Sequence, residues 1–387
     1  MDRRILILTG VFLEGVGGPP TLLKALNKDL IKRGYKMTVL TYGKRKQAKK
    51  YPYPVKVVSN KWPGFLKKFI YLKKGLWLAL RSDIIYNQDL YTAGLTSLII
   101  KRFLGKKLVT RFVGDSAWEK ALNQGETVDD ILTFQDKKYS YLIEKHKKIR
   151  KKILFNSDKI IVASNFLKDL AQKIGLSEEK IEVIYNSIDF LEDEHSSVSK
   201  EEINRKLNLD GKVILTNARL IPWKGIDMLI EIMPRLIKRH GRIILVIISD
   251  GPERVNLEKL VVELGLENNV FFTGIIGRQQ VIDYLKIADV FVLNTNYEGM
   301  SHVLLEAMKV GAPIITTPAG GNPETIKDEK TGLLVDYRNK EQWLEAINRI
   351  LDNPELAKRL VDNARKDLKR FNWDNLVNKT INVFRNI

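Results

Sequence analysis

The sequence predicts an α/β protein with two doubly wound parallel-sheet domains in tandem. Three observations support this prediction: the chain has 387 residues, short apolar runs alternate with longer amphipathic stretches, and the alternation restarts in the second half. The length suits two domains of about 150 to 200 residues each. Strands of four to eight residues that alternate with helices are typical of βαβ units and of a parallel sheet.

The apolar runs give the expected strands, and the amphipathic stretches between them give the expected helices. The helices include Pro20–Arg33, Asn165–Ile174 and Gly225–Arg239. In the first half the expected strands are Ile5–Thr9, Met37–Thr41, Val55–Val58, Ile84–Tyr86, Lys107–Val113, Lys159–Ala163 and Ile181–Tyr185. In the second half they are Val213–Asn217, Ile243–Ile248, Val270–Thr273, Val290–Asn294 and Pro313–Thr316.

A polar segment without apolar periodicity, Leu191–Ser199, is the expected linker. It separates an N-terminal domain, residues 1–190, from a C-terminal domain, residues 200–372. Ligands of doubly wound sheets bind at the carboxyl ends of the strands, where the strand order reverses. Two such domains that face each other would place one cleft between them.

Several classes of protein do not fit the composition. The chain has no cysteine, which excludes disulfides, a thiol nucleophile and thiolate metal sites, and none of its four histidines are spaced as a metal pair. No stretch approaches the roughly 20 apolar residues that span a bilayer. The apolar run in Met1–Leu8 is too short for a signal peptide and is interpreted as a first buried strand. We therefore expect a cytoplasmic protein.

The net charge of +19 is carried entirely by the first half. Residues 1–190 contain 37 Lys and Arg against 18 Asp and Glu, and the remaining 28 of each sign cancel. This asymmetry indicates an anionic partner, such as a membrane surface, a nucleic acid or an acidic substrate. A solvated, lysine-rich surface is the alternative interpretation.

The segment from Asn294 to Ala307 has the most distinctive chemistry. A strand ends in a polar loop with Glu298, and Gly299 allows a tight turn or close approach of the backbone. Ser301 is suited to cap the next helix, whose first-turn amides favour an anion such as phosphate. Glu306 lies on that helix, where a carboxylate can accept hydrogen bonds from a ribose diol. A capped helix with one exposed Glu is the structural alternative.

Two further loops follow strands of the second half. Asn217–Gly225 carries Arg219 and Lys224, two cations that suit a diphosphate, although solvated loop charges are the alternative for this loop alone. Ser249–Glu253 is a tight turn before a helix. In the first half, Gly15–Pro20 resembles a phosphate loop but lacks G-x-G-x-x-G and a P-loop lysine, so a dinucleotide-dependent dehydrogenase fits poorly.

Together these features resemble the retaining glycosyltransferases of family four, the glycosyl transferases group 1, which have the GT-B fold. The resemblance covers nearly the whole chain and is strongest for Glu298-x7-Glu306. It extends through Asn217–Gly225, Ser249–Glu253, Thr273-Gly274, Gly311–Ile315, Gly320–Glu324 and Thr331–Val335, and more loosely through Gly17-Gly18 and Tyr185–Asp189.

The resemblance implies a role for each matching position. Arg219 and Lys224 would neutralise the diphosphate of a UDP- or GDP-sugar, Glu306 would hold the ribose, and Glu298 would contact the sugar or stabilise positive charge at the anomeric carbon. The remaining donor-binding positions would be backbone amides or base contacts: Gly17, Gly18, Ile275, Gly299, Met300, Ser301 and Leu304. It further implies a metal-independent hexosyltransferase that retains configuration and needs no cofactor. A C-terminal helix, residues 373–387, would cross back to the first domain.

One segment departs from the family pattern. Many relatives have a His in a first-domain loop that faces the donor sugar, where this chain has Thr110–Glu119. Asp115 is the candidate catalytic substitute for that His. It is equally suited to be a helix N-cap.

The acceptor is expected on the first domain. The segment Lys61–Leu80 interleaves lysines with Phe69, Leu72 and Trp77, which suits an interfacial helix on anionic lipid, and a second basic run follows at Lys145–Lys152. We therefore expect a glycan or lipid-linked acceptor and a peripheral position on the inner face of a membrane. In the alternative, the aromatics pack on the domain core and the lysines face solvent, and Gly75 also interrupts the pattern.

Three other functions remain as alternatives. A sugar-nucleotide epimerase would use the same fold. A basic nucleic-acid- or membrane-binding protein without catalysis is the second alternative, although nucleic acid is not expected because no RRM, KH or helix-turn-helix signature is present. An inactive, nucleotide-binding scaffold is disfavoured because both acidic positions and both cations are present.

Overall fold

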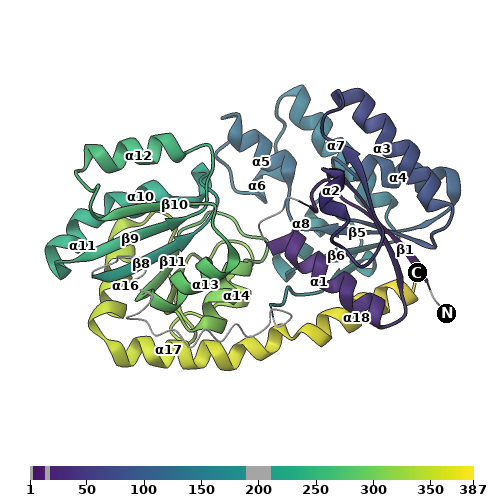
Figure 1. Ribbon diagram of the computed structural model, residues 1–387. Coiled ribbons are helices and arrows are strands. Elements are labelled where there is room, and N and C mark those ends of the chain that lie inside the picture. The colour runs from purple at the N-terminus through teal and green to yellow at the C-terminus, as the bar shows by residue number, and fades with distance from the viewer. Residues whose placement is uncertain (1–2, 14–17, 189–210) are drawn as a thin grey trace. The chain divides into compact units, whose positions relative to one another are not determined.

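The computed structural model describes residues 3–13, 18–188 and 211–387. Gly17 and the expected linker, Leu191–Ser199, therefore lie outside the described residues. The chain forms two compact units: residues 1–186 with 373–387, and residues 187–372. Each unit is an α/β structure in which helices cover both faces of a parallel sheet (Figure 1). The predicted fold class is confirmed.

The first unit has a seven-stranded sheet in the order β3-β2-β1-β4-β5-β6-β7, in which every neighbouring pair is parallel. The order reverses between β1 and β4, as in a Rossmann sheet. The strands are β1 (Arg4–Leu8), β2 (Lys36–Gly43), β3 (Val55–Ser59), β4 (Ile84–Asn87), β5 (Lys107–Phe112), β6 (Lys159–Val162) and β7 (Ile181–Val183).

The helices of the first unit pack on this sheet through leucine, isoleucine and tyrosine side chains such as Leu8, Tyr71 and Ile100. They are α1 (Gly18–Lys32), α2 (Arg45–Ala48), α3 (Gly64–Ala79), α4 (Gly94–Leu104), α5 (Ser116–Asn123), α6 (Thr133–Asp136), α7 (Tyr141–Asn156), α8 (Asn165–Lys173) and α18 (Trp373–Arg385), with a 3-10 turn at Glu178–Lys180.

The C-terminal helix α18 is an integral part of the first unit. Arg33 forms an ion pair with Asp374 at 2.9 Å and donates to Asn378 Oδ1 at 2.6 Å. Inside the unit, the ring of Phe384 lies edge-on to that of Tyr86, with 5.2 Å between the centroids. Residues from the two ends of the chain therefore stabilise one core.

The second unit has a six-stranded parallel sheet in the order β10-β9-β8-β11-β12-β13, which is again the Rossmann order. The strands are β8 (Lys212–Asn217), β9 (Ile243–Ile248), β10 (Val270–Gly274), β11 (Val290–Leu293), β12 (Ile314–Thr316) and β13 (Leu333–Leu334). The twelve expected strands are present, with ends that differ by up to two residues. The two-residue β13 was not among the expected strands.

The helices of the second unit pack around a core that includes Trp343, Leu245 and Ile347. They are α10 (Ile226–Glu231), α11 (Met233–His240), α12 (Arg254–Glu263), α13 (Arg278–Ile287), α14 (His302–Val310), α15 (Asn322–Thr325), α16 (Lys340–Asp352) and α17 (Pro354–Asp367), with 3-10 turns at Pro222–Lys224 and Leu368–Phe371.

One helix expectation was wrong in detail. The single helix expected over Gly225–Arg239 is divided at Ile232, because Pro234 stands in the first turn of α11 and has no amide to continue the earlier helix. Gly75 lies within α3. It is buried, and a Cβ there would lie 3.0 Å from Thr96 Cγ2, so the glycine allows α3 to pack closely on α4.

Candidate functional site

The two loops with the strongest sequence signals meet in the second unit. Strands β8 and β11 are neighbours at the point where the strand order reverses. The carboxyl ends of parallel strands share one edge, so the loop after β8, residues 217–225, lies beside the loop after β11, residues 294–301. This topology brings together Lys224 and Glu298, which are 74 positions apart in the sequence.

Lys224 forms an ion pair with Glu298 at the centre of this site. Its Nζ also donates to Thr295 Oγ1 at 3.2 Å and to the carbonyl oxygen of Tyr297 at 3.3 Å. Only 11% of the Lys224 side chain and 19% of the Glu298 side chain are exposed. The ammonium group is therefore held at a defined point, with each of its protons directed to an oxygen.

The backbone around Lys224 is held by Gly225 and Asn294. Gly225 ends the 3-10 turn with φ of 50°, and a Cβ there would lie 2.3 Å from Asn294 Nδ2. The buried Asn294 side chain donates to the Gly225 carbonyl oxygen at 2.8 Å and accepts from the Arg338 amide at 3.2 Å. Only glycine fits this left-handed position against the amide group.

The backbone of Glu298 is held by a second glycine loop. The Gly321 amide donates to the Glu298 carbonyl oxygen at 2.8 Å. Gly320 has φ of 60°, and a Cβ there would lie 2.0 Å from the same oxygen. The Gly320-Gly321 pair, which the sequence singles out only by family resemblance, thus supports the carboxylate position.

The next element, α14, begins directly after this loop. The first-turn amides of a helix have no partner within the helix, and they give its start a partial positive charge. Leu304 itself is fully buried, so it can contact a ligand only through its backbone amide. Gly299 and Met300 are also buried. Ser301 occupies the expected N-cap position, but its side chain forms no capping hydrogen bond.

Glu306 projects from α14 toward Arg278 at the start of α13. Its Oε1 lies 3.3 Å from Arg278 Nη1, and 19% of the Glu306 side chain is exposed. Burial raises the pKa of this carboxyl above its usual value of 4.5, and the guanidinium of Arg278 lowers the pKa in part. The carboxylate is thus a desolvated acceptor, which favours a ligand that donates hydrogen bonds to it.

The other predicted donor-binding side chains of this unit are open to solvent. Arg219 is exposed, and within the described residues no ion pair holds its guanidinium. Ile275, which follows β10, is 66% exposed. The turn Ser249–Glu253 supports the Arg219 loop: the Leu220 amide donates to the Asp250 carbonyl oxygen, and the Glu253 amide to the Leu220 carbonyl oxygen, each at 3.1 Å.

Asp115 and Gly18 belong to the first unit. Gly18 is the first residue of α1. Asp115 is the N-cap of α5 and accepts from the Ala117 amide at 3.0 Å and from Gln135 Nε2 at 3.0 Å. It also forms an ion pair with Arg150, and only 4% of the Arg150 side chain and none of the Asp115 side chain is exposed. These contacts favour the capping alternative for Asp115.

Two residues of the site are not assigned roles by the sequence. Arg278 opens α13 three residues after Ile275, and only the tertiary contact with Glu306 distinguishes it from a solvated arginine. Asn294 lies inside a quoted motif, but its bonds to Gly225 and Arg338 join segments far apart in sequence. A polar residue at the end of a buried strand is the only local signal that points to Asn294.

Neither a metal cluster nor a membrane span is found in the described parts of the chain. Residues 3–13, 18–188 and 211–387 contain no group of three or more His, Asp or Glu side chains that could hold a metal ion. In the same ranges no helix has the length and hydropathy to cross a bilayer.

Comparison with known proteins gives matches to both halves of the chain. Residues 16–190 match the family described as Glycosyltransferase Family 4, and residues 199–367 match Glycosyl transferases group 1. The chain is 34% identical over 237 residues to the uncharacterized glycosyltransferase MJ1607 of Methanocaldococcus jannaschii, which is 60% of each chain. It is 30% identical over 196 residues to the GDP-mannose-dependent α-(1-6)-phosphatidylinositol monomannoside mannosyltransferase of Mycobacterium tuberculosis, which is 48% of this chain and 51% of that protein.

The matched part of the chain thus spans less than two thirds of either relative's length. Among solved structures, Anabaena Alr3699/HepE in complex with UDP and glucose is similar over the full length of both chains, with a TM-score of 0.82 and 20% identity. At this identity the structural likeness establishes the fold alone.

Proposed function

We propose that this chain, which belongs to glycosyltransferase family 4 (the glycosyl transferases group 1), transfers a sugar from a nucleotide-diphosphate sugar to an acceptor hydroxyl group. The observation that carries the proposal is the Lys224–Glu298 pair beside the start of α14. A cation, a carboxylate and the first-turn amides of a helix at one sheet edge match the groups that a sugar diphosphate presents.

The donor diphosphate would bind between Lys224, Arg219 and the first-turn amides of α14. In the structure, Lys224 is paired with Glu298. A diphosphate offers the ammonium a stronger anionic partner, so donor binding would release the Glu298 carboxylate from Lys224. The same two cations would stabilise the negative charge that grows on the leaving group in the transition state.

The nucleoside would bind further along the same edge. The desolvated Glu306 carboxylate is an acceptor for the ribose hydroxyls, and Arg278 favours its ionised form. The exposed Ile275 offers an apolar surface for the base. UDP- and GDP-sugars are the donor candidates.

Glu298 would act on the transferred sugar. Once its partner Lys224 is engaged by the diphosphate, the carboxylate can stabilise positive charge at the anomeric carbon or hold a sugar hydroxyl. The proposed reaction retains anomeric configuration and uses protein cations, in place of a metal ion, to balance the charge of the leaving diphosphate. The product sugar would then have the same anomeric configuration as the donor sugar.

The proposed acceptor is a glycan or a lipid-linked hydroxyl at the inner face of a membrane. One relative carries a phosphatidylinositol monomannoside acceptor in its name, and the first unit has the excess positive charge that suits an anionic acceptor or surface. Sugar transfer and lipid proximity are separate parts of this proposal.

Two measurements test the proposal. UDP, GDP and ADP are first compared by thermal shift. At least one of them should raise the Tm of the protein, because a ligand that binds only the folded state stabilises that state. Purified protein is then given UDP-, GDP- and ADP-sugars, and donor breakdown and product configuration are followed by NMR. If no nucleotide stabilises the protein, the donor site is contradicted. A product with inverted configuration would contradict the retaining mechanism. Epimerised donor without transfer would indicate an epimerase.

A further inference from the structure

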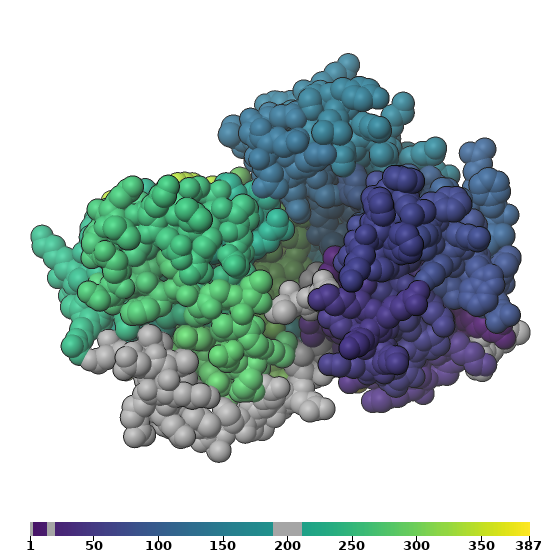
Figure 2. Space-filling view, turned by 45° about the horizontal axis from the view of Figure 1, so that its top comes forward, coloured from purple at the N-terminus to yellow at the C-terminus, as the bar shows by residue number. Residues whose placement is uncertain are grey.

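One segment of the first unit is strongly basic and contains no acidic residue. Between positions 30 and 82 the chain has fifteen Lys and Arg and no Asp or Glu. The segment includes α2, β3 and α3. It lies in the dark purple and indigo surface that faces the viewer in Figure 2. The charge asymmetry of the whole sequence is therefore concentrated on a few adjacent elements.

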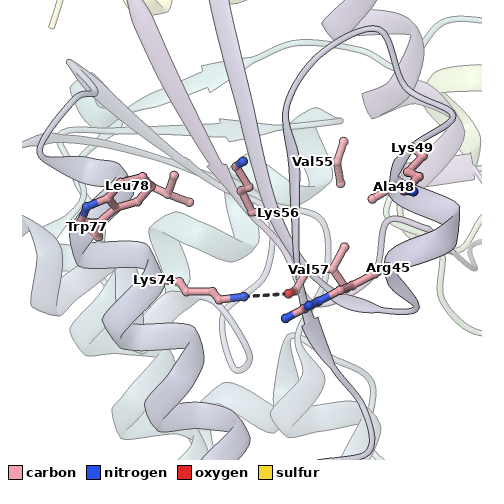
Figure 3. Close-up of a pocket in the computed structure, with 9 residues that line it drawn as sticks. All are labelled: Arg45, Ala48, Lys49, Val55, Lys56, Val57, Lys74, Trp77 and Leu78. Atoms are coloured by element: carbon pink, nitrogen blue, oxygen red, sulfur yellow. Dashed lines mark hydrogen bonds between the residues drawn. The ribbon is translucent and has the colours of Figure 1, made fainter.

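A cavity of about 460 Å³ opens between these three elements. Figure 3 shows cationic side chains around it: Arg45 and Lys49 from α2 and its C-terminal end, Lys56 from β3 and Lys74 from α3. No carboxylate in the described residues forms an ion pair with any of the four. Val55, Val57 and Trp77 complete an apolar wall.

The cations are close enough to repel one another. Lys74 Nζ donates to the Val57 carbonyl oxygen at 3.0 Å, which holds it at the cavity wall (Figure 3). Burial lowers the pKa of Lys74, and the charges of Arg45 and Lys56 lower it further. An anion that binds among such like charges lowers their electrostatic free energy.

The helix beside the cavity exposes an apolar face. Tyr71, Gly75 and Ala79 are spaced by four residues and face the core, and the Tyr71 hydroxyl lies 3.1 Å from the Thr9 carbonyl oxygen. Away from this buried stripe, α3 exposes Phe65 at 80%, Phe69 at 62% and Trp77 at 56%. These three aromatics therefore do not pack in the core, whereas Tyr71 does, so the alternative weighed for this segment is wrong only in part.

From these observations we infer that the face formed by α2, β3 and α3 binds an anionic phospholipid membrane, with a lipid phosphate group in the Arg45–Lys49–Lys56–Lys74 cavity. The aromatic face of α3 lies at the boundary between headgroups and acyl chains. Charge complementarity identifies the occupant, because a surface with four clustered cations and exposed aromatic rings matches an interface that is anionic outside and apolar beneath. Trp77 belongs to both parts, since it lines the cavity and is exposed on the helix.

The inference deepens the lipid-proximity part of the proposed function and does not depend on sugar transfer. The test is vesicle flotation of the full chain with phosphatidylcholine alone and with phosphatidylglycerol added. We expect binding only to the anionic vesicles, and the triple variant R45Q/K49Q/K56Q should weaken it by at least about tenfold, because it leaves Lys74 as the one cavity cation that can pair with a lipid phosphate. Trp77→Ala should weaken binding without changing its dependence on anionic lipid.

A matched control lies in the same segment. Lys44, Lys46 and Lys50 are exposed lysines that do not line the cavity. The variant K44Q/K46Q/K50Q removes the same charge, and it should retain most of the binding. An equal loss in the two triple variants would show that local charge alone holds the protein on the vesicle, and it would overturn the phosphate site.

Soluble phosphate distinguishes the two sources of the anion. Titration with inorganic phosphate and with glycerol phosphate should compete only weakly with vesicles, because the aromatic face has no role in binding a free ion. Saturable binding of either compound without vesicle binding would overturn the membrane assignment. Nucleoside diphosphates should raise the Tm of these variants as much as that of the wild type. This control distinguishes loss of membrane binding from loss of the donor site.

Discussion

Lys224 and Glu298 form a largely buried ion pair that joins the loop after β8 to the loop after β11. The pair is fixed by Gly225 and Asn294 on one side and by Gly320 and Gly321 on the other. In the proposed reaction the two side chains act on different parts of the donor. The contact between them therefore holds both charges at one edge of the sheet.

Removing either partner of this pair should affect stability and activity together. Lys224→Ala leaves the Glu298 carboxylate partly desolvated without its cation, so we expect a loss of about 1–3 kcal/mol in the free energy of unfolding. Loss of an electrostatic stabiliser of the leaving group should lower kcat by about 100-fold or more. Urea denaturation and donor turnover measure the two effects.

The double variant K224A/E298A separates these effects. It should recover part of the lost stability, because no buried charge is left alone, but none of the activity. The exposed Arg235–Glu341 pair is the control, and Arg235→Ala should change neither quantity measurably. Near wild-type turnover in Lys224→Ala would remove the diphosphate role from this lysine.

Nucleotide binding should depend on the ionisation of Glu306. Burial raises the pKa of its carboxyl above 4.5, and ribose hydroxyls donate to the ionised form. As the pH rises toward the raised pKa, the dissociation constant for the preferred nucleotide should fall by up to about tenfold per pH unit, and it should level off above that pKa. Calorimetric titrations with the nucleotide over a pH series measure this dissociation constant. Glu306→Gln should weaken binding by roughly 10- to 100-fold and abolish this dependence.

The same residue should limit the stability of the ligand-free protein. Because the pKa of Glu306 is raised on folding, the folded chain binds more protons than the unfolded chain between pH 4.5 and the raised value. Stability from the neutral carboxyl is present below pH 4.5 and is lost as the pH rises through the raised pKa. Glu306→Gln should thus raise Tm at neutral pH relative to wild type and have little effect below pH 4.5. A lower Tm at neutral pH would show that the Arg278 contact outweighs the desolvation.

Asp115 should prove structural. Asp115→Asn leaves the buried guanidinium of Arg150 without its counterion, so we expect a loss of about 3–5 kcal/mol in the free energy of unfolding. Asn353→Ala, which removes a cap without an ion pair, should cost only about 1 kcal/mol. Turnover per folded molecule, measured well below Tm, should stay within a few-fold of wild type. A much larger loss of turnover would restore the catalytic role considered for this carboxylate.

Gly225 should be essential for the position of Lys224. Gly225→Ala places a methyl group against Asn294 Nδ2, and it also strains a left-handed position. Gly105 is a matched control, because it is also left-handed, with φ of 62° and ψ of 17°, and no atom of a neighbouring segment lies within 4 Å of the place a Cβ would take. Gly105→Ala should cost about 1–2 kcal/mol from backbone strain alone. Gly225→Ala should cost more and also weaken nucleotide binding in a thermal-shift titration. Equal nucleotide binding in the two variants would contradict the positioning role.

The sequence alone was sufficient for the fold class, and it nominated the loops that carry the candidate site. Periodicity is a local property, so apolar runs such as Ile243–Ile248 were located to the residue. Helix ends were less predictable where one residue competes with the general pattern, as Pro234 does between α10 and α11. The very short β13 gives no periodic signal at all.

What the tertiary structure decided is which side chains meet. Lys224 and Glu298 were nominated separately, and the reversal of strand order between β8 and β11 places them in contact. Arg278 acquires a role only through Glu306, and the cavity beside α3 exists only because α2, β3 and α3 pack together. Contacts between residues far apart in sequence depend on strand order and packing, and neither is encoded in any local window of the chain.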